Sequence, residues 1–187
     1  GGEIMIDGHM LGNMTRQEIA RKAAYLAQGK NIPDMTVEQM VLHGRFPHLH
    51  YPRRYTMRDR EIAFSAMAQA GIAEYARQSL HTLSGGMRQN AYIAMALAQS
   101  TDYILLDEPT THLDISHQLE LMKTLQSLAQ SGKGIISVMH DLPMALMFSD
   151  RMVLLNDGRV ICDDEPAQVC KQKMILRVFG VDVERSA

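Results

Sequence analysis

The chain has 187 residues, of which 46% are hydrophobic and 21% are charged, a balance that is typical of a globular domain with a sizeable core. The net charge of -2 gives no indication of a partner such as nucleic acid or anionic lipid. Two cysteines, Cys162 and Cys170, are too few for a disulfide framework and are typical of the reducing cytosol.

The first thirty residues predict a hairpin, a short helix and a buried strand. The stretch "EIMIDGHML" alternates and turns at Asp7-Gly8, a dipeptide that favours a tight hairpin turn. Thr15 and Glu18 form a capping-box pattern before a short helix. The apolar "AYLA" predicts a strand that ends at Gln28, and "GKNIPDM" is expected to be a loop.

Residues 36–80 predict helices and no strand. Thr36 can cap a first helix over "VEQMVLHGR", and Thr56 a second over "MRDREIAFSAMAQAGI". We therefore expect a helical subdomain inserted between strands. The residues that recur at the spacing of one face of the second helix are Ile62, Ala66 and Ala70.

The rest of the chain alternates short apolar strands with helices, which predicts an α/β fold with a parallel sheet covered by helices on both faces. We expect, in order, a helix over 87–99, a strand over 103–106, a helix over 115–129, a strand over 134–139, a short helix from Pro143, a hairpin turning at Asp157-Gly158 and a helix over about 166–179.

Two adjacent carboxylates follow a fully apolar strand in "YILLDEPTTHLD". Ligands of open parallel sheets bind at the carboxyl ends of the strands, so Asp107 is placed to hold Mg²⁺. Glu108 can then act as general base toward an attacking water, an effect worth about 10²–10⁴-fold in rate. A solvated turn at the end of a strand is the alternative for the pair alone.

The tetrapeptide "LSGG" at 83–86 lies directly before a helix. Ser84 offers a hydroxyl, the glycines Gly85 and Gly86 allow close approach of the backbone, and the helix N-terminus supplies oriented N–H groups. These features favour an anion site. A serine-capped turn is the structural alternative.

Two further strand ends carry polar side chains. His140 follows "IISVM" and can hydrogen-bond a terminal phosphate, while the amide of Gln28 can contact Mg²⁺ and water. A structural histidine and a surface glutamine are the alternatives. A further set of histidines fits no metal-binding spacing and is interpreted as loop histidines: His43, His48, His50 and His81.

Four motifs occur in a fixed order: "YLAQ" at 25–28, "LSGGMRQ" at 83–89, "YILLDEPTTHLD" at 103–114 and "VMHD" at 138–141. Together they resemble the ATP-binding subunit of ABC transporters, from residue 1 to about 169. The resemblance implies a P-loop NTPase core with an N-terminal antiparallel hairpin. It implies a core region over 1–31, a helical subdomain over 32–82, a core over 83–165 and a C-terminal helix and tail over 166–187.

The resemblance also implies a role for each motif residue in binding or hydrolysing ATP with Mg²⁺. Glu108 corresponds to the catalytic base and His140 to the switch histidine. Gln28 corresponds to the Q-loop glutamine, which contacts Mg²⁺ and senses the membrane subunits, and Asp107 to the Walker B aspartate, which holds Mg²⁺. The remaining residues implied to contact nucleotide are Asp114 of the D-loop and the signature residues Leu83, Ser84, Gly85 and Gly86.

The implied partners are those of a transporter. They are a second ATP-binding subunit in a head-to-tail dimer, two transmembrane permease subunits and, indirectly, a substrate-binding protein, at the cytoplasmic face of the membrane. No nucleic acid is expected. "HGRFPH" and "TTHLDISHQLELM" look most like importers of iron chelates, including siderophores, and of cobalamin or haem.

One motif of the family is not found in the 187 residues. A phosphate-binding loop needs G-x-x-x-x-G-K-[ST], and neither "GKN" at 29–31 nor "GKG" at 132–134 fits it. The resemblance places this loop before the first hairpin, so we expect a chain that lacks the first strands and the P-loop. Such a chain is expected to be inactive alone and to expose an apolar sheet face that favours aggregation.

Two residues of the signature region depart from the family, since Met87 replaces a polar residue and Asn90 an arginine. Met87 cannot hydrogen-bond as glutamine does, which predicts a weaker anion site. Two other functions stay open on the sequence: a non-transport ABC ATPase that acts on DNA or ribosomes, and a non-catalytic interaction module.

Overall fold

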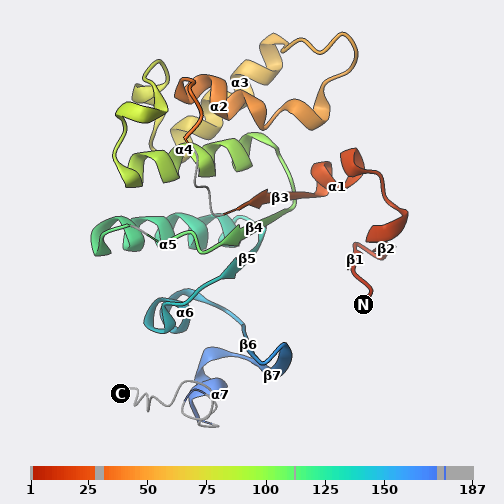
Figure 1. The fold of residues 1–187 in the computed structure, drawn as a ribbon, viewed down its shortest axis with the longest axis vertical. Helices are drawn as coiled ribbons and strands as arrows, with labels where there is room; N and C mark the ends of the chain where they lie inside the picture. The colour runs from red at the N-terminus through yellow and green to blue at the C-terminus, as the bar shows by residue number, and fades with distance from the viewer. Residues whose placement is uncertain (1, 28–31, 112, 172–174, 176–187) are drawn as a thin grey trace. The chain divides into compact units, whose positions relative to one another are not determined.

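A computed structural model describes residues 2–27, 32–111, 113–171 and 175. The chain divides into two compact units, Gly1–Val138 and Met139–Ala187, and each is described by itself (Figure 1).

The first unit begins with the predicted hairpin. Strands β1 (Met5–Ile6) and β2 (His9–Met10) pair antiparallel, and the Asp7-Gly8 turn has positive φ angles of 49° and 78°, as a two-residue hairpin turn requires. The Asp7 carboxylate accepts hydrogen bonds of 2.7 Å from both Lys22 and Tyr103. These two bonds lower the pKa of Asp7 and fasten the hairpin to the start of a core strand.

A short 3-10 turn, η1 (Leu11–Asn13), leads into helix α1 (Arg16–Lys22) and strand β3 (Ala23–Leu26). The predicted capping box is present, because Thr15 and Glu18 each accept a hydrogen bond from the backbone N–H of the other. Helix and strand are thus confirmed. Gln28 lies outside the described residues.

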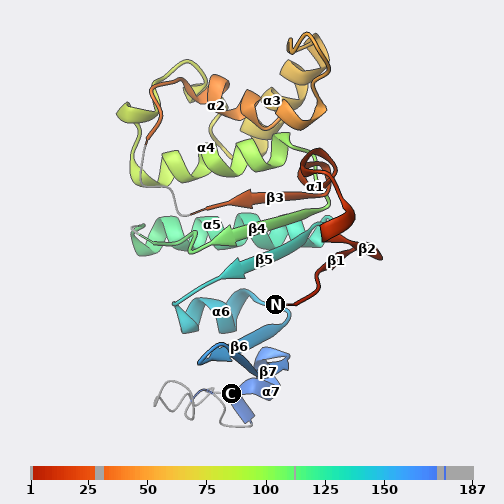
Figure 2. The ribbon, with the colours of Figure 1, turned by 45° about the vertical axis from the view of Figure 1, so that its right-hand side comes forward.

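The core of the first unit is a parallel sheet of three strands in the order β3-β4-β5, with β4 at Tyr103–Asp107 and β5 at Gly134–Val138 (Figure 2). Leu26 pairs with Leu106, and Asp107 pairs with Val138. The carboxyl ends of all three strands therefore lie at one edge, where the motif residues were predicted to gather.

Three helices pack together beside β3: α2 (Val37–His43), α3 (Met57–Gln69) and α4 (Gly85–Ala98) (Figures 1 and 2). Thr36 and Thr56 cap α2 and α3 with complete capping boxes. Short 3-10 turns connect the helices: η2 (Phe46–His48), η3 (Ala73–Tyr75) and η4 (Leu80–Thr82). The buried face of α3 holds Ala63, Ala66 and Met67, whereas the expected Ile62 is only half-buried.

A buried ion pair joins these helices. The guanidinium of Arg45, which is 7% exposed, donates to Asp59 Oδ1 at 3.0 Å and to the Ala98 carbonyl oxygen at 2.8 Å. Arg45 thereby connects the segment after α2 with α3 and the end of α4. Gly44 lies so close to α4 that a Cβ there would come within 2.2 Å of the Met95 carbonyl oxygen.

Only one face of the sheet is covered. Ile104 and Leu106 are 1% and 2% exposed on the face crossed by α5 (Ile115–Gln130) (Figure 2). On the opposite face, among the described residues, Tyr25 is 61% exposed and Ile136 59% exposed. Strand alternation places these side chains on a face that no described helix of this unit buries, in line with the expectation that a chain without the P-loop exposes an apolar sheet face.

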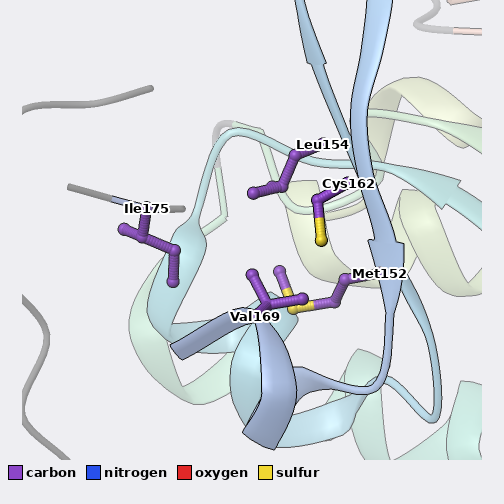
Figure 3. Close-up of a cluster of buried hydrophobic side chains, with 5 residues drawn as sticks. All are labelled: Met152, Leu154, Cys162, Val169 and Ile175. Carbon is purple, nitrogen blue, oxygen red and sulfur yellow. The ribbon is translucent and has the colours of Figure 1, made fainter. Parts of the chain in front are cut away.

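The second unit holds helix α6 (Leu142–Phe148), the antiparallel strands β6 (Met152–Asn156) and β7 (Arg159–Asp164), and helix α7 (Pro166–Lys171). The predicted turn at Asp157-Gly158 is confirmed by φ angles of 48° and 72°. The small core of this unit is apolar and draws on both strands and α7; Figure 3 shows its members Met152, Leu154, Cys162, Val169 and Ile175. Within the described residues, no helix is long and apolar enough to cross a bilayer.

Candidate functional site

The carboxylate pair lies where β4 ends. Asp107 is the last residue of the strand, and Glu108 follows with a positive φ of 47°. A positive φ is unfavourable for a residue with a Cβ and is concentrated at functional positions. The Glu108 backbone N–H donates to the Val138 carbonyl oxygen at 3.0 Å, and Thr111 Oγ1 donates to Glu108 Oε2 at 3.1 Å. The surrounding turn thus fixes this conformation.

Asp107 has the chemistry that a magnesium ligand needs. Its half-buried carboxylate offers the hard oxygen atoms that Mg²⁺ prefers, and it lies at the edge of the sheet where phosphates bind. The hydroxyl of Tyr25 donates to Asp107 Oδ2 at 3.3 Å. Burial of the hydroxyl, together with the charge of Asp107, raises the pKa of Tyr25. Asp107 therefore fits the metal.

The signature turn opens helix α4. Ser84 is the N-cap residue, and its hydroxyl accepts from the Met87 backbone N–H at 3.2 Å. Helices α1, α2 and α3 each carry an acceptor side chain three residues after the cap, namely Glu18, Gln39 and Asp59. Met87 occupies this position in α4 and has no oxygen to return the bond. The departure at Met87 therefore removes one half of a capping box.

His117 is a site residue that the sequence reasoning missed. A Cβ on Gly86 would lie 2.2 Å from His117 Cδ2, so the ring lies directly against the signature glycine. His117 Nδ1 lies 2.8 Å from both carboxylate oxygens of Asp114. The backbone N–H of His117 donates to the Asp114 carboxylate, and this bond is the main cause of the lowered pKa of Asp114. The hydrogen bond to the His117 ring lowers that pKa further. His117 therefore joins the signature turn to Asp114.

A local signal for His117 was available in the sequence. Asp114 is the N-cap residue of α5, and His117 is the third residue of that helix, which is the position that reaches back to a capping side chain. The stretch "LDISH" was used only as an indication of subfamily. The contact with Gly86 joins residues distant in sequence, and no local pattern predicts it.

The structure brings together some of the predicted site residues. Asp107 and Glu108 share one strand end, and His117 links Gly86 with Asp114. His140 belongs to the second unit, where it is exposed and precedes Asp141, the N-cap residue of α6. Its approach to the carboxylate pair stays a prediction.

A groove of about 660 Å³ lies in the helical part of the first unit. Met35, Leu42 and Tyr55 supply apolar lining. The charged rim includes Arg77 and the ion pair of Arg60 with Glu38, whose atoms lie 3.3 Å apart. The groove thus combines apolar and charged side chains in about equal parts.

Solved structures share this architecture. A metal-chelate type ABC transporter in an inward-facing conformation matches with a TM-score of 0.83 and 26% identity, over 89% of this chain and 68% of that chain. A dimeric bacterial ABC transporter cassette matches with a TM-score of 0.73 and 27% identity, over 89% of this chain and 74% of that chain. The fold is therefore that of a P-loop NTPase domain of the ABC type, as predicted.

Sequence comparison gives the family. Residues 1–111 match the ABC transporter family. The chain is 38% identical over 187 residues to the petrobactin import ATP-binding protein FpuD of Bacillus anthracis, covering 99% of this chain and 68% of the relative. It is 39% identical over 182 residues to the ferric enterobactin transport ATP-binding protein FepC of Escherichia coli K12, covering 96% and 67%. The chain belongs to the ABC transporter family, among its ATP-binding proteins.

Proposed function

We propose that this chain forms part of the ATP-hydrolysing subunit of an importer of iron chelates. The observation that carries the proposal is the pair Asp107 and Glu108 at the end of β4, with Glu108 held at a φ of 47°. Its backbone N–H is bonded to Val138, two residues before His140. A shared role of the two carboxylates with His140 is proposed from the order of the motifs in the sequence.

Each residue has one task in the proposed reaction. The Glu108 carboxylate takes a proton from the attacking water as general base, and the bond from Thr111 orients that carboxylate. The His140 imidazole hydrogen-bonds the terminal phosphate. Asp107 and Gln28 would hold Mg²⁺, which when bound neutralises charge on the phosphates.

The signature turn acts on the nucleotide of a second subunit. In a head-to-tail dimer, Leu83, Ser84, Gly85 and Gly86 of one subunit would face the γ-phosphate of ATP held by the other. The His117 ring against Gly86 and the Asp114 carboxylate beside it support a shared role for these residues at the dimer interface. A solved dimeric cassette with the same fold supports a dimer, and the head-to-tail arrangement is proposed from the resemblance of the motifs.

A P-loop is the main phosphate-binding element of such an ATPase. The 187 residues contain no G-x-x-x-x-G-K-[ST], and this loop supplies the backbone N–H groups and the lysine that hold the phosphates. We therefore expect ATP hydrolysis only when a P-loop is joined to the chain.

The groove lined by Met35, Leu42 and Tyr55 is the proposed docking site for a cytoplasmic segment of a permease subunit. Two such subunits would span the membrane, and a substrate-binding protein would deliver the cargo, so the ATP-binding subunit would lie at the cytoplasmic face. The cargo is proposed from the relatives, which are named for petrobactin, ferric enterobactin and iron(3+)-hydroxamate.

A chimera tests the catalytic assignment. The P-loop segment of FepC would be joined to the start of this chain, and ATP hydrolysis would be measured. Glu108→Gln should lower the rate about 10²–10⁴-fold, whereas Glu74→Gln, at an exposed glutamate of the same unit, should leave it unchanged. Equal rates for the chimera and its Glu108→Gln variant would show that Glu108 is not the base.

A further inference from the structure

A basic-aromatic loop, defined as residues 49–58, runs from the end of η2 into the first turn of α3. It extends away from the neighbouring helices in both views (Figures 1 and 2). Tyr51 in this loop is 96% exposed, and Met57 is 74% exposed. Exposed apolar side chains that gather in one contiguous patch are typical of a binding surface.

The charge of this region has one sign. The loop, residues 49–58, contains three arginines and one histidine but no aspartate or glutamate. Arg53 and Arg54 are exposed and form no ion pair with any residue that the structure describes. The Arg53 guanidinium lies over the Phe46 ring, 4.4 Å from its centre. Arg58 is 78% exposed and has only the exposed partner Glu61.

The apolar side chains next to the loop continue its surface. Phe46, whose ring lies under the Arg53 guanidinium, is 45% exposed. Phe64 is 59% exposed and lies seven residues after Met57, on the same face of α3. This exposed face borders the one that buries Ala63 and Met67. Guanidinium groups and unburied aromatic rings therefore occupy one region.

We propose that the basic-aromatic loop binds the surface of an anionic phospholipid membrane. Arginines beside a bilayer are attracted by phosphate headgroups and anionic lipids. Tyrosine, phenylalanine and methionine side chains gain free energy by entering the interfacial layer. The two features are found together here, which favours a lipid surface over a purely acidic protein partner.

The position of the loop agrees with this partner. Tyr55 of the loop lines the groove that is proposed to receive a permease segment. A groove occupied by that segment would hold the loop near the bilayer. The inference rests on the proposed function only for this point, because lipid binding can be measured without a permease.

The net charge of -2 does not oppose the proposal. Exposed charges are screened beyond about 10 Å at moderate ionic strength, so a local cluster decides the attraction of a surface. The net charge of the whole chain does not reveal this basic cluster, because acidic residues elsewhere offset its positive charge.

Vesicle co-sedimentation of the 187-residue chain tests the proposal. The chain should bind vesicles of phosphatidylcholine mixed with phosphatidylglycerol, bind phosphatidylcholine alone weakly, and be released by salt. Arg53→Ala with Arg54→Ala should lower the partition coefficient roughly 30-fold, since each arginine contributes about fivefold. The matched control is Arg16→Ala with Lys123→Ala, which removes two exposed cations from other helices and should change binding little.

A fluorescent probe locates the contact, because the chain contains no tryptophan. The emission of Tyr51→Trp should shift to shorter wavelength with anionic vesicles. The emission of Tyr25→Trp, on the exposed sheet face, should not. A shift in Tyr25→Trp alone would mean that vesicles bind the sheet face and would overturn the proposal, as would equal loss of binding in the two double variants.

The lipid-binding proposal and the catalytic proposal can be contradicted independently of each other. Loop-dependent vesicle binding by a chain whose P-loop chimera hydrolyses no ATP would support this inference and contradict the catalytic one. An active chimera whose loop binds no vesicles would overturn the lipid proposal and support the catalytic one.

Discussion

At the scale of single residues, the backbone of Glu108 links the site to the stability of the fold. A positive φ costs a residue with a Cβ about 1 kcal/mol or more, and glycine avoids this cost. The observed φ of 47° therefore means that the position of the Glu108 carboxylate is set at a cost in stability.

We predict that Glu108→Gly is more stable than Glu108→Ala by about 1 kcal/mol. Both variants lose the carboxylate and its bond from Thr111, so their difference reports the backbone alone. Urea unfolding measures it. A glycine variant that is less stable than the alanine variant would mean that the positive φ is not strained.

The contact between Gly86 and His117 gives a second prediction at this scale. Gly86→Ala would place a Cβ 2.2 Å from the ring, so the ring has to move and its bond to Asp114 is disturbed. We expect a loss of about 1–3 kcal/mol in the free energy of unfolding. The loss should be much smaller in a His117→Ala background, and equal losses in both backgrounds would disprove the contact.

At the scale of elements, the pair of Arg45 and Asp59 determines how the three helices pack. Arg45→Met leaves a buried carboxylate without its cation and should cost about 3 kcal/mol in the free energy of unfolding. The matched control is Arg58→Met, which breaks an exposed pair with Glu61 and should cost less than about 1 kcal/mol. If Arg45→Met and Arg58→Met lowered the free energy of unfolding by similar amounts, the buried pair would contribute no more to stability than the exposed one.

The same pair gives a pH dependence of known sign. Burial tends to raise the pKa of Asp59, but hydrogen bonds from Thr56 and the pairing with Arg45 outweigh burial and hold that pKa below 3.8. A carboxyl whose pKa is lower in the folded than in the unfolded state stabilises the fold at pH values above its unfolded-state pKa. This contribution is lost as the pH falls below about 4. Asp59→Asn should be less sensitive to acid over that range.

The sequence predicted individual elements well, because their signals are local. Thr15, Thr36 and Thr56 each precede a helix with an acceptor three residues on, and both aspartate-glycine turns close hairpins. Helix α4 begins two residues earlier than predicted, because its glycines continue the helix after the Ser84 cap.

Contacts between elements were not predictable in the same way. The Arg45 bonds to Asp59 and Ala98 and the His117 contact with Gly86 join segments far apart in the chain. A periodic pattern shows which side of an element is apolar, but it does not show which element covers that side. The strand pattern alone therefore predicts a sheet with helices on both faces, and only the missing P-loop indicates that one face is left open.

At the scale of the whole molecule, the exposed sheet face should control self-association. Ile136 is 59% exposed beside Tyr25 and Val138 on the same face. We expect Ile136→Lys to raise the monomer fraction in sedimentation velocity and to change the free energy of unfolding by less than about 0.5 kcal/mol. Gln126→Lys adds the same charge on an exposed position of α5 and should leave the association unchanged. If both variants raised the monomer fraction equally, the effect would come from the added positive charge and not from the exposed sheet face.

The central proposal is that Asp107, Glu108, His140 and the signature turn serve ATP hydrolysis, and that this hydrolysis needs a P-loop, a motif that the 187 residues do not contain. The rate of ATP hydrolysis by the purified 187-residue chain, beside that of the P-loop chimera, tests the claim most directly. We predict no turnover by the chain alone and turnover by the chimera that depends on Glu108. Turnover by the chain alone that is lost in Glu108→Gln would contradict the account, because the phosphates would then be held without a P-loop.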